Sequence, residues 1–361
     1  MGDARPVQTI GIIGGGQLGR MLALAAARLG HKTIVVDPGI NCPAAQTCNR
    51  HIVADYDDRR ALDELKACDV VTFEFENVDL DAIRALERTT PVAPSPKALE
   101  ISQDRLTEKR FLSDAGLGTA AFEDVASAEP LKQALDKFGG KGILKTRRFG
   151  YDGKGQIAFT GSSDDPSPEK ALEEIANAPA ILEAFVPFVS EISVIITRDA
   201  GGHSACFEPA RNLHINGILH TSTVPAGVSE KTLQNATTHA KSLADALNYV
   251  GTLGLEFFVL EDGSLIANEF APRVHNSGHW TEAACTISQF EMHIRAITGW
   301  PLPTPVRHSD AVMENLIGED IGKLKSLANR GDILLHDYGK SEARAGRKMG
   351  HFTQMTRKTT Q

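Results

Sequence analysis

The chain has 361 residues, enough for two or three domains, and its 42% hydrophobic and 23% charged content is ordinary for a soluble globular protein. The formal net charge of −8 disfavours a general nucleic-acid-binding protein. Five cysteines without a CxxC pair indicate reduced thiols rather than a disulfide framework. No signal peptide is recognisable and no apolar run reaches about 18 residues, so we expect a cytoplasmic protein without a membrane partner.

Strand and helix patterns alternate through the first hundred residues. Residues 8–13 form an apolar run, a glycine turn leads into a helical pattern, and residues 33–36 and 70–73 are two further apolar runs of strand length. Such alternation predicts a parallel α/β sheet with right-handed crossovers. We expect this first domain to span residues 1–100.

The glycine turn has several possible ligands. Gly14, Gly16 and Gly19 have the spacing of a dinucleotide-binding turn, and Asp37 ends the following strand. In general terms, such a turn aims N–H groups at a helix start, where an anion is stabilised. NAD, a nucleotide monophosphate and a tight turn without ligand are the alternatives. Residues 74–77 follow another strand of this sheet, where they form either a ligand site or a helix start.

From about residue 100 the pattern changes to α+β. We expect a charged helix over 102–112, a long helix over about 280–298, and a strand-rich ending after the prolines of 301–305. A hairpin is expected over 141–160. Further strands predict an antiparallel sheet, at 181–186, 191–197, 204–209, 253–260 and 264–270. We expect domains at 101–300, with a mobile subdomain at about 120–185, and at 301–361.

The segment Gly150–Gln156 is the most informative loop. Its three glycines give a backbone that can donate N–H groups to a polyphosphate, with Lys145 before the loop and Lys154 inside it. The spacing is not that of a Walker loop. An ordinary hairpin turn with exposed lysines is the alternative, and the downstream segment 267–273 decides against it.

Two glutamates on apolar strands predict a cation site. Glu256 and Glu269 lie on strands joined by a short turn, and close, half-buried carboxylates repel each other unless a cation such as Mg²⁺ lies between them. The following segment carries Arg273 and His275 and suits an anionic intermediate. Surface salt bridges and a structural histidine are the alternatives for these residues taken singly.

Together, these motifs resemble those of the ATP-grasp superfamily and, within it, the family of N5-carboxyaminoimidazole ribonucleotide synthetases of purine biosynthesis. They run in order over nearly the whole chain, at residues 14–21, 73–77, 103–109, 150–156, 268–280 and 346–351. The resemblance implies a Rossmann-like preATP-grasp domain, a central ATP-grasp domain and a small C-terminal domain. One departure from the wider superfamily is Ala271, where many relatives have a metal-binding Asn; the nearby amide is Asn268.

The resemblance also implies a reaction. ATP would drive the joining of bicarbonate to the amine of 5-aminoimidazole ribonucleotide through carboxyphosphate, with release of ADP and phosphate. A glycine loop closing over ATP would exclude water. The implied ligands are ATP and Mg²⁺, without biotin or NAD, and the implied partners are a second copy of the chain in a homodimer and, as pathway neighbour, the mutase that uses the product.

Site residues follow from the same resemblance. The implied phosphate-binding residues are Arg105, Lys145, Gly150, Tyr151, Asp152, Gly153, Lys154, Gly155 and Gln156. Adenine and ribose would be bound by Glu183, Ala184, Phe185, Val186, Glu191 and His214. Mg²⁺ would be bound by Glu256 and Glu269, with Asn268 beside them. The implied acceptor site comprises Gly16, Gln17, Leu18, Glu76, Tyr151, Asp152, Arg273, Lys340, Arg347 and Lys348, and the catalytic residues would be Arg273, Asp152 and His275.

Three alternatives compete with this interpretation. A sister ATP-grasp enzyme, such as a formate-using transformylase or a biotin carboxylase, would keep the ATP residues and change the acceptor site. A dehydrogenase would leave residues 150–156 and 268–280 unexplained. A non-catalytic nucleotide-binding module is disfavoured because both glutamates and Arg273 are present.

Overall fold

The N-terminal part of the fold is a four-stranded parallel sheet. The computed structural model describes residues 7–150 and 154–359. The strands lie in the order β3–β2–β1–β4, and β1 pairs in parallel with both β2 and β4. Their bounds are β1 Thr9–Ile13, β2 Lys32–Val36, β3 Arg50–Ile52 and β4 Val70–Phe73, connected through α1 Gln17–Arg28, the short helix η1 Pro43–Gln46, α2 Arg59–Leu65 and, after β4, α3 Leu80–Glu87. The predicted parallel α/β sheet is confirmed.

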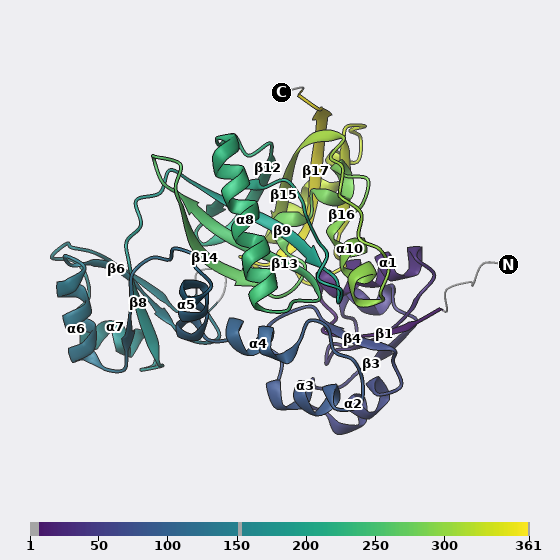
Figure 1. The fold of residues 1–361 in the computed structure, drawn as a ribbon, viewed down its shortest axis with the longest axis horizontal. Helices are drawn as coiled ribbons and strands as arrows, with labels where there is room; N and C mark the ends of the chain where they lie inside the picture. The colour runs from purple at the N-terminus through teal and green to yellow at the C-terminus, as the bar shows by residue number, and fades with distance from the viewer. Residues whose placement is uncertain (1–6, 151–153, 360–361) are drawn as a thin grey trace.

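A second, four-stranded sheet carries the glycine loop. Its order is β5–β8–β6–β7, and all its pairs are antiparallel. The elements are β5 Phe122–Val125, α6 Ala128–Lys137, β6 Lys141–Thr146, β7 Gln156–Thr160, α7 Pro168–Glu174 and β8 Ala180–Ala184. The predicted hairpin over 141–160 is confirmed as β6 and β7, with Lys145 opposite Gln156. Figure 1 shows this unit at one end of the molecule, on the far side of α5 from the N-terminal sheet.

The largest sheet runs through the middle and the C-terminal part of the chain. Its order is β14–β13–β9–β11–β12–β15–β17–β16, with β10 paired to β9. Its strands are β9 Ser190–Arg198, β10 Ser204–Cys206, β11 Ala210–Ile215, β12 Ile218–Val224, β13 Gly251–Val259, β14 Leu265–Ala271, β15 Ser309–Ile317, β16 Ile333–Asp337 and β17 Lys348–Arg357. Because β12 pairs with β15, the strand-rich ending extends this sheet rather than forming a separate one.

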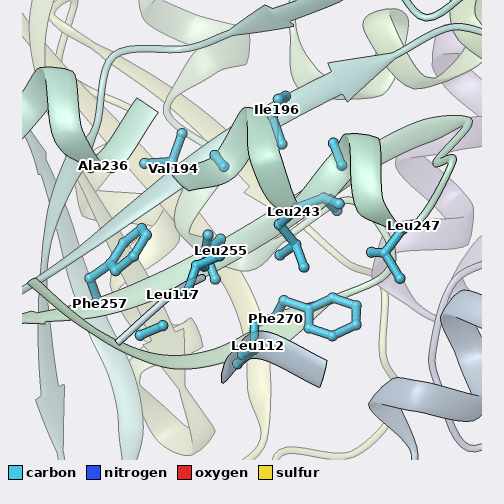
Figure 2. Close-up of a cluster of buried hydrophobic side chains, with 14 of the residues drawn as sticks. Leu112, Leu117, Val194, Ile196, Ala236, Leu243, Leu247, Leu255, Phe257 and Phe270 are labelled. Atoms are coloured by element: carbon cyan, nitrogen blue, oxygen red, sulfur yellow. The ribbon is translucent and has the colours of Figure 1, made fainter. Parts of the chain in front are cut away.

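Helix α8 (Glu230–Ala246) covers one face of this sheet. Its apolar stripe, which includes Ala236 and Leu243, packs against Val194, Leu255 and Phe257 in a cluster of fully buried side chains (Figure 2). Burial of apolar surface contributes about 25 cal/mol per Å², so this cluster is a main source of stability for the sheet. Glu256 lies between Leu255 and Phe257 in β13 and therefore faces the opposite side of the sheet.

Two helix predictions are corrected by the structure. The long helix expected over 280–298 is broken into α9 (Thr281–Ala284) and α10 (Gln289–Ile297), because Cys285 is extended and the Ser288 side chain caps α10. The charged helix expected from residue 102 is α5 (Arg105–Asp114), preceded by α4 (Pro96–Ser102); Asp104 accepts hydrogen bonds from the first-turn N–H groups of α5.

Short helices complete the connections. They are η2 Asn276–Gly278 after β14, and η3 Gly318–Lys323 with α11 Leu324–Leu327 between β15 and β16. Within residues 7–150 and 154–359, none of the helices combines the length and apolar character that crossing a bilayer requires.

Candidate active site

A cavity of about 460 Å³ brings together residues from the N-terminal sheet, the glycine-loop hairpin and the large sheet. Many of the residues predicted to bind the nucleotide, the metal ion and the acceptor line this cavity, although they are distributed from residue 17 to residue 348. The predicted residues in its wall are Gln17, Leu18, Glu76, Arg105, Gly150, His214, Glu256, Glu269, Arg273, His275 and Lys348. The cavity is therefore the candidate active site.

A β-bulge places the two predicted metal-binding glutamates together. Leu255 of β13 pairs with Phe270 of β14, and Phe257 pairs with Ala267, so Glu256 alone faces both Asn268 and Glu269. The side-chain oxygen Oδ1 of Asn268 is buried without a hydrogen-bond partner.

The donor chemistry at this bulge fits Mg²⁺. Two carboxylates and an unpaired amide oxygen are the hard oxygen ligands that Mg²⁺ prefers. Within the described part of the chain, no group of three or more His, Cys, Asp or Glu side chains is arranged to hold a metal ion. The two glutamates therefore need oxygen ligands of another kind, such as phosphate or water, to complete a shell.

The pKa values of the two glutamates are shifted in opposite directions. Glu269 is paired with the guanidinium of Arg105, Nη1 to Oε2 at 2.9 Å. Although burial opposes ionisation, Arg105 lowers the pKa of Glu269 below its usual range. Burial and the nearby charge of Glu269 raise the pKa of Glu256. One ionised and one more readily protonated carboxyl group thus face each other across the bulge.

Two buried lysines lie beside the predicted metal-binding residues. The ammonium groups of Lys145 and Lys109 lie 3.0 and 3.2 Å from Oε2 of Glu183, which is 2% exposed. Lys109 also donates to the backbone oxygen of Asn268 at 2.7 Å. The carboxylate of Glu183 therefore holds two cations through Oε2, whereas its Oε1 is buried without a hydrogen-bond partner. The predicted role of Glu183 in nucleotide binding stays a prediction.

Sequence reasoning missed two residues of this network. Lys109 and Glu108 lie on α5 behind Arg105, and Glu108 accepts a hydrogen bond from the N–H of Phe270 at 2.8 Å. Burial and the charge of Glu269 raise the pKa of Glu108 to about 8. Residues three and four apart share a helix face, so the spacing from Arg105 could have indicated both.

His214 and Glu191 meet on neighbouring strands, as expected for one sub-site. Nδ1 of His214 lies 2.5 Å from Oε2 of Glu191. Burial opposes the charged ring, but this hydrogen bond and the charges of the nearby glutamates raise the pKa of His214. His214 lines the cavity, whereas Ala184, Phe185 and Val186 lie outside its wall.

The predicted acceptor residues are only partly brought together. Arg273 is paired with Glu76 through two hydrogen bonds, and Lys348 and Gln17 lie in the same cavity wall. Lys340 and Arg347 do not line the cavity. They donate instead to backbone oxygens of Lys348 and Glu342, respectively.

The glycine turn before α1 is already occupied by carboxylates. The N–H groups of Gly16 and Gly19 donate to Glu74 at 2.6 and 2.7 Å, and that of Gly15 donates to Asp37 at 2.8 Å. These three N–H groups donate within the chain, whereas Gln17 and Leu18 of the same turn line the cavity, so ligand binding by the turn, including the role of Gly16, stays a prediction. Helix starts stabilise anions, and here a glutamate of the chain itself is the anion.

Part of the predicted phosphate loop is described. Arg105 donates to the backbone oxygen of Gly150 at 3.3 Å. Gly155 has a φ of +69°, and an added Cβ would lie 2.6 Å from Oγ1 of Thr146, so this position requires glycine. Gln156 begins β7, two residues after Lys154. Tyr151, Asp152 and Gly153 lie outside the described residues.

Three protein families match successive parts of the chain. Residues 7–103 match the ribonucleotide synthetase preATP-grasp domain, residues 110–290 the ATP-grasp domain, and residues 311–361 the phosphoribosylaminoimidazole carboxylase C-terminal domain. The second match contains the glycine-loop sheet and strands β9 to β14 of the large sheet, and the third contains β16, β17 and most of β15.

Individual relatives cover almost the whole chain. An N5-carboxyaminoimidazole ribonucleotide synthase of Brucella melitensis is 59% identical, over 98% of each chain. A crystal structure of an N5-carboxyaminoimidazole ribonucleotide synthetase in complex with ADP has 45% identity and a TM-score of 0.94, and covers 98% of this chain and 93% of that one. A synthase of Aspergillus clavatus, in complex with ADP and 5-aminoimidazole ribonucleotide, has 29% identity and a TM-score of 0.91, with 98% and 95% coverage.

Proposed function

This chain belongs to the family of N5-carboxyaminoimidazole ribonucleotide synthases, and from that premise we propose how its cavity carries out the reaction. It is an ATP-grasp enzyme with N5-carboxyaminoimidazole ribonucleotide synthase activity in purine biosynthesis. The observation that carries the proposal is one cavity whose wall contains Glu256 and Glu269 together with Arg273 and Lys348.

The proposed chemistry has two steps. An oxygen of bicarbonate attacks the γ-phosphorus of ATP, the bond from that phosphorus to the β,γ-bridging oxygen breaks, and ADP leaves. The carboxyphosphate formed breaks down to phosphate and CO₂, whose carbon joins the amine nitrogen of 5-aminoimidazole ribonucleotide as the amine loses a proton. Bicarbonate is the attacking group, so no covalent protein nucleophile is needed.

Cationic side chains would hold the phosphates. Arg105 and Lys145 flank the glycine loop and lie next to Glu269 and Glu183. Glu256, Glu269 and the amide oxygen of Asn268 would hold Mg²⁺, which when bound neutralises charge on the β- and γ-phosphates. The raised pKa of His214 favours a charged ring that can donate to ribose or phosphate oxygens.

The other end of the cavity would bind the acceptor and the carboxyphosphate. Arg273 supplies a planar guanidinium, which suits a carboxylate or phosphate group. Lys348 would contact the ribonucleotide phosphate, with Gln17 beside it. Burial and the charge of Arg273 lower the pKa of His275 to about 3, so this ring is neutral and can accept a hydrogen bond from the amine side. Asp152 stays a prediction.

Assembly, location and pathway neighbour are part of the same proposal. We infer a homodimer, a cytoplasmic location and a mutase that takes up the product, all from the family resemblance. Sedimentation equilibrium of the purified protein tests the first of these: a mass of one chain would contradict it.

The function itself is tested by ADP release. Purified protein is supplied with Mg-ATP and bicarbonate, with and without 5-aminoimidazole ribonucleotide. We expect ADP release to require the ribonucleotide. Binding of ATP without such stimulation would indicate a sister ATP-grasp enzyme with another acceptor.

A further inference from the structure

Three consecutive residues, Gln103 to Arg105, hold the residues just before the glycine loop. Oε1 of Gln103 accepts a hydrogen bond from Nη2 of Arg148 at 2.8 Å. The next residue, Asp104, accepts from Nε and Nη2 of Arg147 at distances from 2.8 to 3.1 Å. The backbone N–H of Arg105 donates to the backbone oxygen of Arg147 at 2.9 Å. We call these contacts between 103–105 and 147–150 the clasp.

The clasp continues into the acceptor end of the cavity through Gln103. Its Nε2 donates to the backbone oxygens of Glu76 at 2.7 Å and Val78 at 2.8 Å. The carboxylate of Glu76, in turn, is held by Arg273. Gln103 is only 6% exposed, so water offers little replacement for these bonds.

The side-chain amide of Gln103 is therefore shared between two parts of the site. Its oxygen binds the glycine-loop side and its nitrogen binds the acceptor side. Because one planar amide group makes all three hydrogen bonds, a displacement of the Glu76 loop must move the amide relative to Arg148. Arg105, which belongs to the clasp, also pairs with Glu269, one of the proposed metal-binding residues.

We propose that Gln103 is a positioning residue that ties the start of the phosphate-binding loop to the loop carrying Glu76, so that phosphoryl transfer is coupled to a correctly placed acceptor site. This inference rests on the proposed function. It assigns to Gln103 and Arg148 a role in coupling that requires no contact of either side chain with the reacting atoms.

Three variants distinguish the hydrogen bond of Gln103 to Arg148 from its hydrogen bonds to Glu76 and Val78. Gln103→Leu removes all three hydrogen bonds, whereas Gln103→Glu keeps an acceptor for Arg148 and loses the donors to Glu76 and Val78. Arg148→Met breaks only the glycine-loop half, and because Arg148 is exposed this variant is expected to fold. Gln234→Leu, at an exposed position of α8, is the matched control.

The readouts are the ratio of ADP released to ribonucleotide carboxylated and the two KM values. We expect a ratio near one for the wild type and Gln234→Leu, and a several-fold higher ratio for the three test variants. Gln103→Glu should raise KM for the ribonucleotide about tenfold with KM for ATP little changed, and Arg148→Met should raise chiefly KM for ATP. Gln103→Leu should show both changes.

A ratio near one with unchanged KM values in all folded test variants would overturn the inference, even if kcat or the unfolding temperature falls. If Gln103→Leu fails to fold, Arg148→Met alone decides between these outcomes. Failure of the proposed function is distinct from both, because it would appear in the wild type as ADP release that does not respond to the ribonucleotide.

Discussion

Arg273 and Glu76 form a two-pronged ion pair although they lie 197 positions apart in the chain. Nε and Nη2 of Arg273 donate to the two carboxylate oxygens at 2.5 and 2.9 Å. Glu76 follows β4 of the N-terminal sheet, and Arg273 follows β14 of the large sheet. The pair therefore joins the two sheets at the cavity and fixes the plane of the guanidinium that we assign to carboxyphosphate.

Breaking this pair should impair catalysis more than stability. Arg273→Met removes the guanidinium and leaves Glu76 partly buried and unpaired, and we expect kcat/KM to fall at least about a hundredfold, or roughly 3 kcal/mol in transition-state stabilisation. Glu76→Gln keeps the shape and should lose less. Steady-state kinetics of both single variants and the double variant checks this.

The control for that pair is Arg295→Met, which removes an ion pair with Glu291 within α10. Strongly non-additive effects of the Arg273 and Glu76 variants are expected, because neighbours in one network couple. Additive effects, or an equal loss in the Arg295 variant, would contradict a functional pair.

Glu269→Ala should abolish turnover. The change removes one of the two carboxylates assigned to Mg²⁺ and leaves the Arg105 guanidinium without its partner. ADP release is measured over a range of Mg²⁺ concentrations, with Glu261→Ala in the β13–β14 turn as control. Appreciable Mg²⁺-dependent activity in the Glu269 variant would remove this residue from the site.

Lys348→Ala should chiefly raise the apparent KM for the ribonucleotide. A phosphate contact made equally in ground and transition states affects KM rather than kcat, and an increase of about tenfold is expected. Lys325→Ala, at an exposed position of α11, is the matched control. A rise in KM for ATP instead would show that Lys348 lies at the nucleotide end.

Glu282 should make stability depend on pH. Burial raises its pKa to about 7, and its Oε2 lies 3.3 Å from Nε2 of His336, whose own pKa is lowered by burial to about 4. Between about 4.5, the ordinary value, and 7 the unfolded chain ionises while the folded chain keeps the proton, so stability falls as pH rises through this window. At pH 8, Glu282→Gln should thus increase the free energy of unfolding by about 1–3 kcal/mol relative to the wild type. This increase is seen as a higher unfolding temperature.

Thermal unfolding of wild type and Glu282→Gln at a series of pH values measures that difference. It should shrink as the pH is lowered and vanish below the ordinary value of 4.5, where the carboxyl group is protonated in both the folded protein and the unfolded chain. A constant difference at all pH values would mean that ionisation of Glu282 is not its cause.

The parallel sheet, the glycine-loop hairpin and part of the cavity wall could be predicted from the sequence. Apolar runs separated by helical patterns determine sheet type locally, and Glu256 and Glu269 lie on strands joined by a short turn. The one-residue bulge that lets Glu256 face both Asn268 and Glu269 depends on pairing register, which short-range patterns do not specify.

The sequence did not indicate where a side chain from a distant part of the chain binds a polar group of the predicted site. The turn at Gly14–Gly19 has the pattern of an anion site, but Glu74 from another strand fills it. Likewise Glu183 has the position expected for a nucleotide ligand, but two lysines from other elements bind its carboxylate. Local spacing indicates that a charged group is bound at such a position. The tertiary fold determines whether that group belongs to the chain itself or to a ligand.

The central claim is that bicarbonate attacks the γ-phosphorus of ATP in this cavity. Bicarbonate labelled with ¹⁸O tests it directly, because the oxygen that forms the new P–O bond stays with phosphate when the carbon leaves. We predict that each turnover with 5-aminoimidazole ribonucleotide places one labelled oxygen in inorganic phosphate. Unlabelled phosphate formed together with the carboxylated product would contradict the carboxyphosphate route and the role assigned to Arg273.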